Sequence, residues 1–267
     1  GGDQSYSVYE QAQRYRAAKA VLQDIYALDA EHADAVKALE QLWEEGYTVA
    51  AHQLGKFYRD DLSTLRDHEK AEQWFRHSAE AGNDFSEYAL GKLLLTQKRT
   101  VEAMEWLGKA ADHGSQFARY RLGKIYLTGE SVPKDVAKAL AYLTASADQG
   151  NQFAQYTLGK LYLLGRDVPP DREQAREWLS RAAAQGNEYA RFFLDCFDQF
   201  RDPSVMLAAS KLLHHMSRIF QNNSIPPVNP AGIRIDSKRR RRLMEKRMAM
   251  GHKADDHEEQ TQYQQSM

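Results

Sequence analysis

Three short motifs recur in the same order through the middle of the chain. Leu-Gly-Lys occurs four times, beginning at Leu54, Leu90, Leu122 and Leu158, so the copies are 36, 32 and 36 residues apart. An aromatic residue followed by a hydrophobic one, and a glycine followed by Asn or Ser, keep the same phase in all four copies. Motifs that stay in phase over several copies indicate structural repeats, which bury a continuous core only by stacking on one another.

Each repeat predicts two helices joined by a turn. In the clearest copy, the first helix is predicted over 152–164, with Ala154, Leu158 and Leu161 on one apolar face. The second helix is predicted over about 172–185. The fold class that follows is all-α, and the chain is expected to be an α-solenoid of helix–turn–helix units.

Glycines and capping residues set the expected ends of these helices. Gly165 and Gly186 are expected to end the two helices of this copy, and Asp171 is a good N-cap. In the shortened turn of the second copy, Thr100 is the expected N-cap. Gly159 lies inside a helix, where glycine costs about 1 kcal/mol relative to alanine, so we expect it to permit close approach of the paired helix.

The repeat resembles the Sel1-like repeat family of the tetratricopeptide class. Residues 156–187 carry its pattern almost completely: Tyr-x-Leu-Gly-x-x-Tyr, Val-Pro-x-Asp, Trp-Leu and Ala-Ala-x-x-Gly-Asn. The resemblance covers about Tyr47 to Asp202. It implies a right-handed α-solenoid that acts as a protein-interaction scaffold, with no active site of its own.

The domain organisation follows from the repeats and from a change of composition after them. The expected segments are an N-terminal capping helix pair over 1–46, Sel1-like repeats over 47–201, a closing helix over 202–222, a proline-rich linker over 223–235, and a basic helix with a polar tail over 236–267. The linker contains three of the seven prolines, which predicts a stiff extended chain.

Composition agrees with a soluble interaction protein. Mean hydropathy is −0.69, which suits a thin stack in which each helix keeps one wet face. The single cysteine, Cys196, suits a reducing compartment, and no stretch approaches the roughly 20 apolar residues of a membrane span, so the sequence predicts a cytoplasmic protein. The chain begins with Gly1-Gly2, and we expect the natural protein to extend upstream.

A ladder of rings and lysines is the main candidate binding site. In every copy a lysine follows an aromatic residue or histidine by four positions, which places both on one helix face. The candidate residues are His52, Lys56, Tyr88, Lys92, Tyr120, Lys124, Tyr156 and Lys160. Because first helices line the concave side of such solenoids, they predict a groove for a helix or extended segment of a protein partner. The alternative is that the lysines are surface residues and the tyrosines pack between repeats.

A second candidate site is the basic run near the end of the chain. Seven basic residues and one acidic residue occupy positions 238–247. The basic residues are Lys238, Arg239, Arg240, Arg241, Arg242, Lys246 and Arg247. They predict either phosphate contacts with DNA or a solvated, solubilising tail. An anionic membrane surface is less favoured, and we expect no membrane partner.

Three further segments resemble the C-terminal end of mobilisation relaxases from Gram-positive mobile elements. These segments are 212–220, 229–238 and 251–257. The resemblance implies an accessory region of a relaxase, whose nicking domain uses a tyrosine and a His-x-His metal pair. No His-x-His pair occurs in this chain, so no catalytic residue is carried over.

Motifs for independent catalysis are missing from the sequence. The chain has no glycine-rich phosphate loop and no Cys-x-x-Cys pair, and the His, Asp and Glu residues of 252–258 match no known metal spacing. We therefore expect no enzyme activity, no cofactor and no metal site. The expected function is a protein-interaction scaffold, with nucleic-acid binding through the basic run as the alternative.

Overall fold

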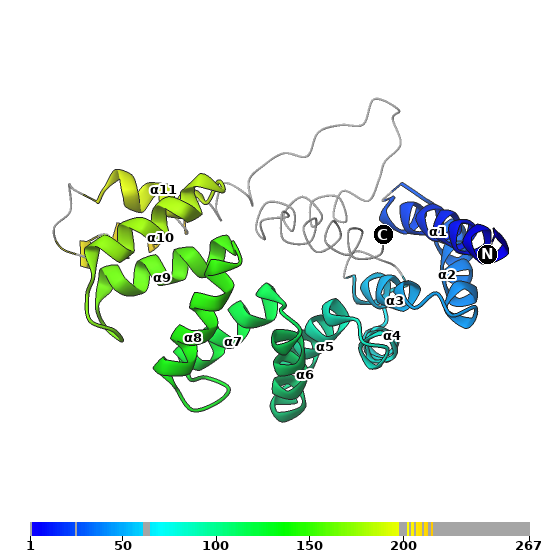
Figure 1. The fold of residues 1–267 in the computed structure, drawn as a ribbon, viewed down its shortest axis with the longest axis horizontal. Coiled ribbons are helices and arrows are strands. Elements are labelled where there is room, and N and C mark those ends of the chain that lie inside the picture. The colour runs from blue at the N-terminus through cyan, green and yellow to red at the C-terminus, as the bar shows by residue number, and fades with distance from the viewer. Residues whose placement is uncertain are drawn as a thin grey trace. The chain divides into compact units, whose positions relative to one another are not determined.

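The computed structural model describes residues 2–24, 26–60 and 65–197, and separate residues between 202 and 215. Every regular element within these residues is an α-helix (Figure 1). The helices are α1 (Gly2–Gln23), α2 (Asp29–Glu44), α3 (Val49–Arg59), α4 (His68–Glu80), α5 (Asp84–Thr96), α6 (Thr100–Asp112), α7 (Gln116–Thr128), α8 (Val136–Asp148), α9 (Gln152–Leu164), α10 (Arg172–Ala184) and α11 (Glu188–Asp195). The prediction of an α-solenoid of helix–turn–helix repeats is confirmed.

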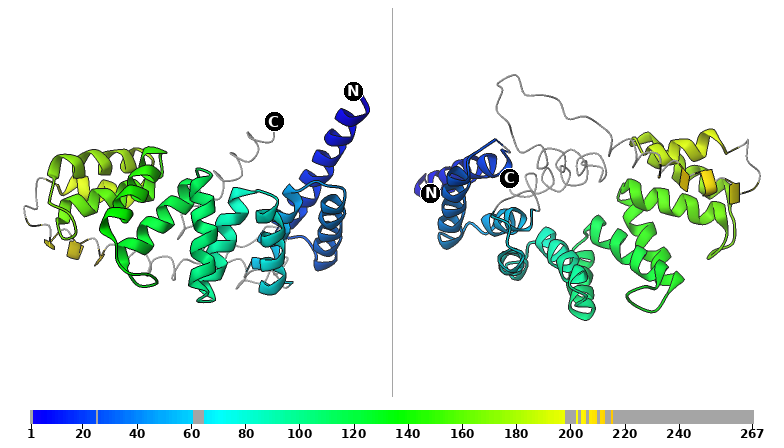
Figure 2. Two further views of the ribbon diagram at one scale, coloured as in Figure 1. Left: turned by 60° about the horizontal axis from the view of Figure 1, so that its bottom comes forward. Right: turned by 180° about the vertical axis from the view of Figure 1, so that it is seen from behind.

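The helices belong to two compact units, one up to Leu90 and one from Gly91 onward, with the boundary inside α5. In the first unit α1 packs on α2, and α3 packs on α4. In the second unit α7 packs on α8, and α9 packs on α10, as the views in Figure 2 show. Each pair is one repeat, and a first helix also packs on the second helix of the preceding repeat, as α7 does on α6 and α9 does on α8.

Mid-helix glycines bring the two helices of a repeat together, as predicted. A Cβ at Gly159 would lie 2.6 Å from Leu179 Cγ on α10, and one at Gly123 would lie 2.6 Å from Leu143 Cγ on α8. In the first unit, a Cβ at Gly55 would lie 2.5 Å from the ring of Phe75. These distances are shorter than van der Waals contact, so the pairing excludes any side chain there.

Most of the capping residues predicted from the sequence lie at helix ends in the structure. The carboxylate of Asp171 accepts a hydrogen bond from Gln174 N at 3.1 Å, and Asn187 caps α11 in the same way. Gly165 ends α9 in the left-handed conformation with φ of 61°. The prediction for Thr100 is wrong by one position, because Arg99 is the N-cap of α6 and makes no side-chain cap bond.

The last described helix is fixed to the repeat before it. Phe197 follows α11 and is 1% exposed. The guanidinium groups of Arg172 and Arg176 each lie 4.4 Å from the centre of its ring, and Arg172 Nη2 also donates to Phe197 O at 2.9 Å. The described residues after Pro203 are helical. The predicted linker over 223–235 and the segment 236–267 lie outside the described residues.

Candidate functional site

The ladder lysines of the second unit have equivalent positions on their helices. Lys92, Lys124 and Lys160 each follow the glycine that faces the paired second helix, on α5, α7 and α9. Successive helical residues point about 100° apart. Each lysine therefore leaves the helix beside the packed face, and all three side chains are half-buried.

The tyrosines of the same ladder join one repeat to the next. The ring of Tyr120 on α7 lies 6.1 Å from that of Phe153 on α9. The ring of Tyr156 on α9 lies 6.2 Å from Tyr189 and 6.0 Å from Phe193, both on α11. Aromatic pairs at such distances stabilise packing beyond their buried area. The interpretation of these tyrosines as packing residues between repeats is therefore supported.

The lysines on α7 and α9 have perturbed electrostatics. Burial lowers the pKa of Lys124 below its ordinary value, the charge of Arg121 lowers it further, and Glu130 opposes the change. Burial also lowers the pKa of Lys160, and the charges of Lys124 and Lys211 add to that effect. A lowered lysine pKa means that the surroundings disfavour the ammonium form.

Two charged residues that act on these lysines were not predicted from the sequence. Arg121 and Lys211 act on the ladder lysines, although neither belongs to the repeated pattern. Arg121 lies three residues before Lys124, so helical spacing could have found it. Lys211 comes from the segment after the repeats, and no spacing rule connects it to Lys160. We call Arg121, Lys124, Lys160 and Lys211 the cation cluster.

In the first unit, the ladder takes a different form and the prediction needs correction. Lys56 is half-buried, but His52 and Tyr88 are only 2% and 7% exposed. His52 Nδ1 lies 2.6 Å from Ser86 Oγ, which donates to Ser78 Oγ at 2.7 Å. The ring of His52 is therefore part of a buried polar network through Nδ1, and at 2% exposure it offers almost no surface to a partner.

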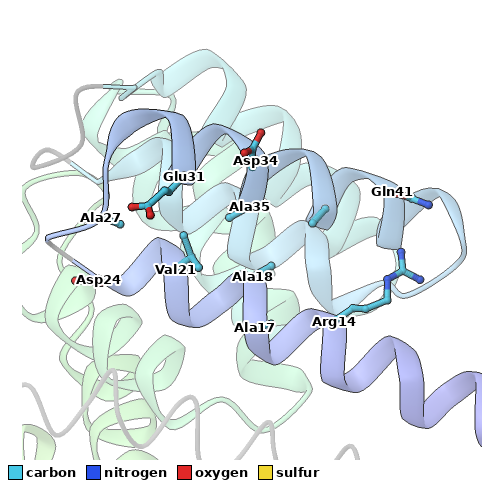
Figure 3. A pocket seen from close by; sticks show the side chains of 11 residues that line it. Arg14, Ala17, Ala18, Val21, Asp24, Ala27, Glu31, Asp34, Ala35 and Gln41 are labelled. Atoms are coloured by element: carbon cyan, nitrogen blue, oxygen red, sulfur yellow. The ribbon is translucent and has the colours of Figure 1, made fainter.

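A pocket of about 540 Å³ lies between α1 and α2 (Figure 3). Its walls are mostly alanines and Val21, with polar side chains at its margins. At one end, Arg14 forms a bidentate pair with Glu45 at 2.8 and 2.9 Å, which raises the pKa of Arg14 and lowers that of Glu45. The short side chains of the alanines leave the room that forms this pocket.

Other candidate chemistry is limited within the described residues. No group of three or more His, Cys, Asp or Glu residues in the described part of the chain is placed to hold a metal ion. Cys196 is half-buried, and burial together with Asp195 raises the pKa of its thiol. Among the described helices, none is both long and apolar enough to cross a membrane. The basic residues of 238–247 lie outside the part that the structure describes.

Helix–turn–helix units that share one sequence pattern and stack in order define a repeat protein of the tetratricopeptide class. The Sel1 repeat family matches residues 48–83, 85–115, 116–151 and 152–187, which together make up more than half of the chain. The chain belongs to the Sel1 repeat family. Proteins of this family are generally protein-interaction scaffolds and generally non-catalytic.

Solved structures agree with this assignment. A Sel1 repeat protein from Oxalobacter formigenes shares 26% identity at a TM-score of 0.59, and the match covers 89% of this chain and 87% of that one. The protein c5321, a protective antigen present in uropathogenic Escherichia coli strains, shares 23% identity at a TM-score of 0.62, covering 85% of this chain. The match spans 51% of c5321, about half its length. A comparison with curated proteins finds no match.

Proposed function

We propose that this chain is a non-catalytic protein-interaction scaffold, and that its first helices α7 and α9 bind a helix or an extended segment of a protein partner. One observation carries the proposal. Lys124 and Lys160 hold half-buried ammonium groups on neighbouring first helices, and among the described residues neither forms an ion pair. A cation that is partly removed from water and has no ion pair is suited to a partner of opposite charge.

The proposal is tested by partner capture with matched variants. Immobilised wild-type chain is compared with a Lys124→Glu/Lys160→Glu variant in lysate of the native host, and captured proteins are identified by mass spectrometry. A Lys109→Glu/Lys138→Glu variant makes the same change of charge at exposed positions on the second helices α6 and α8. We expect a partner that the first variant loses and the second keeps.

Capture is then measured with the purified partner. Isothermal titration calorimetry should show binding to the wild-type chain and to the second-helix variant, with the first-helix variant weakened by about tenfold or more, since like charges across an interface are strongly unfavourable. Equal affinities for all three chains would exclude α7 and α9 as the binding surface. Circular dichroism of each variant verifies that the helices are intact.

As a second candidate we propose nucleic-acid binding through the basic run at 238–247, in an accessory region of a mobilisation relaxase. Its support is the sequence alone: seven basic residues in that run and the resemblance of the flanking segments. Fluorescence anisotropy with DNA compares residues 1–267 with 1–234. About six phosphate contacts give a slope of log affinity against log salt of roughly −5, and a flat salt response contradicts this function.

A further inference from the structure

Four cations from three segments of the second unit act on one another. Arg121 and Lys124 lie on α7, Lys160 lies on α9, and Lys211 comes from the helical residues after the repeats. Burial disfavours the charged form of Lys124 and of Lys160, and the charge of another member of the cluster adds to this effect in both cases. A surface site that concentrates positive charge in this way attracts negatively charged groups.

The described residues provide little compensation for these charges. Among the described residues, Glu130 is the carboxylate that acts on Lys124, and none of them forms an ion pair with Lys124 or Lys160. The Nε atom of Arg121 is buried and has no hydrogen-bond partner among the described residues. A buried donor without an acceptor is unfavourable, so the guanidinium of Arg121 is incompletely satisfied by the described residues.

The aromatic rings beside the cluster show which anion fits. Tyr120 packs on Phe153, and Tyr156 packs on Tyr189 and Phe193. The ammonium of Lys160 lies 5.2 Å from the centre of the Tyr156 ring. Single-stranded nucleic acids bind by stacking their bases on exposed rings, and these rings are already in contact with other groups. Carboxylates of a peptide need only the cations.

We propose that Arg121, Lys124 and Lys160 bind the carboxylates of an acidic segment in a protein partner. Charge complementarity selects this occupant, since Arg121, Lys124 and Lys160 are cationic, half-buried and without a carboxylate ion pair among the described residues. The proposal rests on the proposed function, because it names the chemistry by which α7 and α9 recognise their partner. Lys211 adds to the positive potential, although its side chain is exposed and it acts on Lys160 alone.

The test uses the full chain and a fluorescein-labelled hexaglutamate peptide, with hexaglutamine as the uncharged probe. We expect anisotropy to show binding of hexaglutamate and not of hexaglutamine. A Lys124→Gln/Lys160→Gln variant should bind hexaglutamate at least about tenfold more weakly, because it loses two charge-assisted hydrogen bonds. A Lys109→Gln/Lys138→Gln variant removes two exposed lysines and should remain within about twofold of wild type, since exposed charges are screened.

The basic run is a second region that attracts polyanions, so a third variant replaces Arg239, Arg240, Arg241 and Arg242 with Gln. The inference is overturned if this variant loses hexaglutamate while the Lys124→Gln/Lys160→Gln variant keeps it. The inference is also overturned if the affinity for a labelled 12-nucleotide oligothymidylate falls more in the Lys124→Gln/Lys160→Gln variant than the affinity for hexaglutamate does. In that case the cluster binds nucleic acid.

Failure of the inference is distinguishable from failure of the proposed function. A partner that is captured through α7 and α9, combined with no hexaglutamate binding to the wild-type chain, overturns the carboxylate chemistry and keeps the scaffold function. If the Lys124→Glu/Lys160→Glu variant keeps every captured partner, the proposed function itself fails. If the Lys124→Gln/Lys160→Gln variant binds hexaglutamate about tenfold more weakly and the Lys124→Glu/Lys160→Glu variant loses the captured partner, both the inference and the proposed function are supported.

Discussion

The first helices α3 and α9 follow the same repeat pattern but use its aromatic position in different ways. In α3 the position is His52, which is 2% exposed and lies 2.6 Å from Ser86 Oγ. In α9 it is Tyr156, a half-buried ring that packs on Tyr189 and lies beside the ammonium of Lys160. The repeat fixes where a residue lies on the helix. Its burial and its chemistry depend on which side chain the next repeat places against it.

The largest effect is expected at His52, where the comparison is sharpest. His52→Ala removes a buried ring and leaves the hydroxyls of Ser86 and Ser78 without it, so we expect a loss of about 2–4 kcal/mol in the free energy of unfolding. Urea denaturation followed by circular dichroism measures the loss. A change below about 0.5 kcal/mol would mean that the network does not stabilise this unit.

A paired substitution tests whether the two helices are interchangeable at this position. His52→Tyr with Ser86→Ala reproduces the residues found at Tyr120 and Ala154 of the second unit. Because the two sites are in contact, we expect a coupling of about 0.5–3 kcal/mol, with the double variant more stable than the sum of the single ones predicts. Additive effects would show that the buried histidine and serine act independently.

The next largest effect on stability is expected at the mid-helix glycines that α3 and α9 have in common. Gly55→Ala and Gly159→Ala place a Cβ 2.5 Å from the Phe75 ring and 2.6 Å from Leu179 Cγ, so each should destabilise by about 1–3 kcal/mol. Gly108→Ala is the control, because nothing lies within 4 Å of its added Cβ, and it should stabilise by roughly 0.5–1 kcal/mol. A gain at Gly159 would contradict close packing of α9 on α10.

A smaller effect of opposite sign is expected in the cation cluster. The pKa of Lys124 lies below its ordinary value of 10.5, so the unfolded chain holds more protons than the folded one in the pH window just below that value. Wild-type stability should therefore rise with pH through this window. Lys124→Gln should raise the Tm at pH 7 by about 1–2 °C, and the difference should shrink at alkaline pH.

Differential scanning calorimetry measures this trend. Lys138→Gln, at an exposed position on α8, is the control, and this variant should keep the pH trend of the wild-type chain. A lower Tm for Lys124→Gln at pH 7 would mean that the lysine stabilises the repeat. The cluster would then have no unfavourable electrostatic free energy for a bound anion to relieve.

The smallest effect is expected at an exposed ion pair. Lys134 Nζ lies 2.6 Å from Asp167 Oδ1, and the two residues come from the turns of successive repeats. Exposed pairs are worth little, so Asp167→Asn should change the free energy of unfolding by less than about 1 kcal/mol. If urea denaturation shows a larger loss in the free energy of unfolding, this ion pair between turns contributes substantially to the stacking of the repeats.

Much of the fold was predictable because it depends on local rules. The bounds of α9, the cap at Asp171 and the close approach at Gly159 all follow from helix propensity and spacing. The burial of His52 was not predictable, since it depends on Ser86 in the next repeat. The grouping of Lys160 with Lys211 was missed for the same reason, because it joins segments that no periodicity relates.

The central claim is that a partner contacts the first helices α7 and α9 and not the second helices. A photo-crosslinking residue at position 124, compared with one at position 138, tests it most directly in the native host cell. We expect a discrete crosslinked protein from position 124, absent at position 138 and reduced when Lys160 is also changed to Glu. The same products from both positions, or a product from position 138 alone, would exclude α7 as the surface that binds the partner.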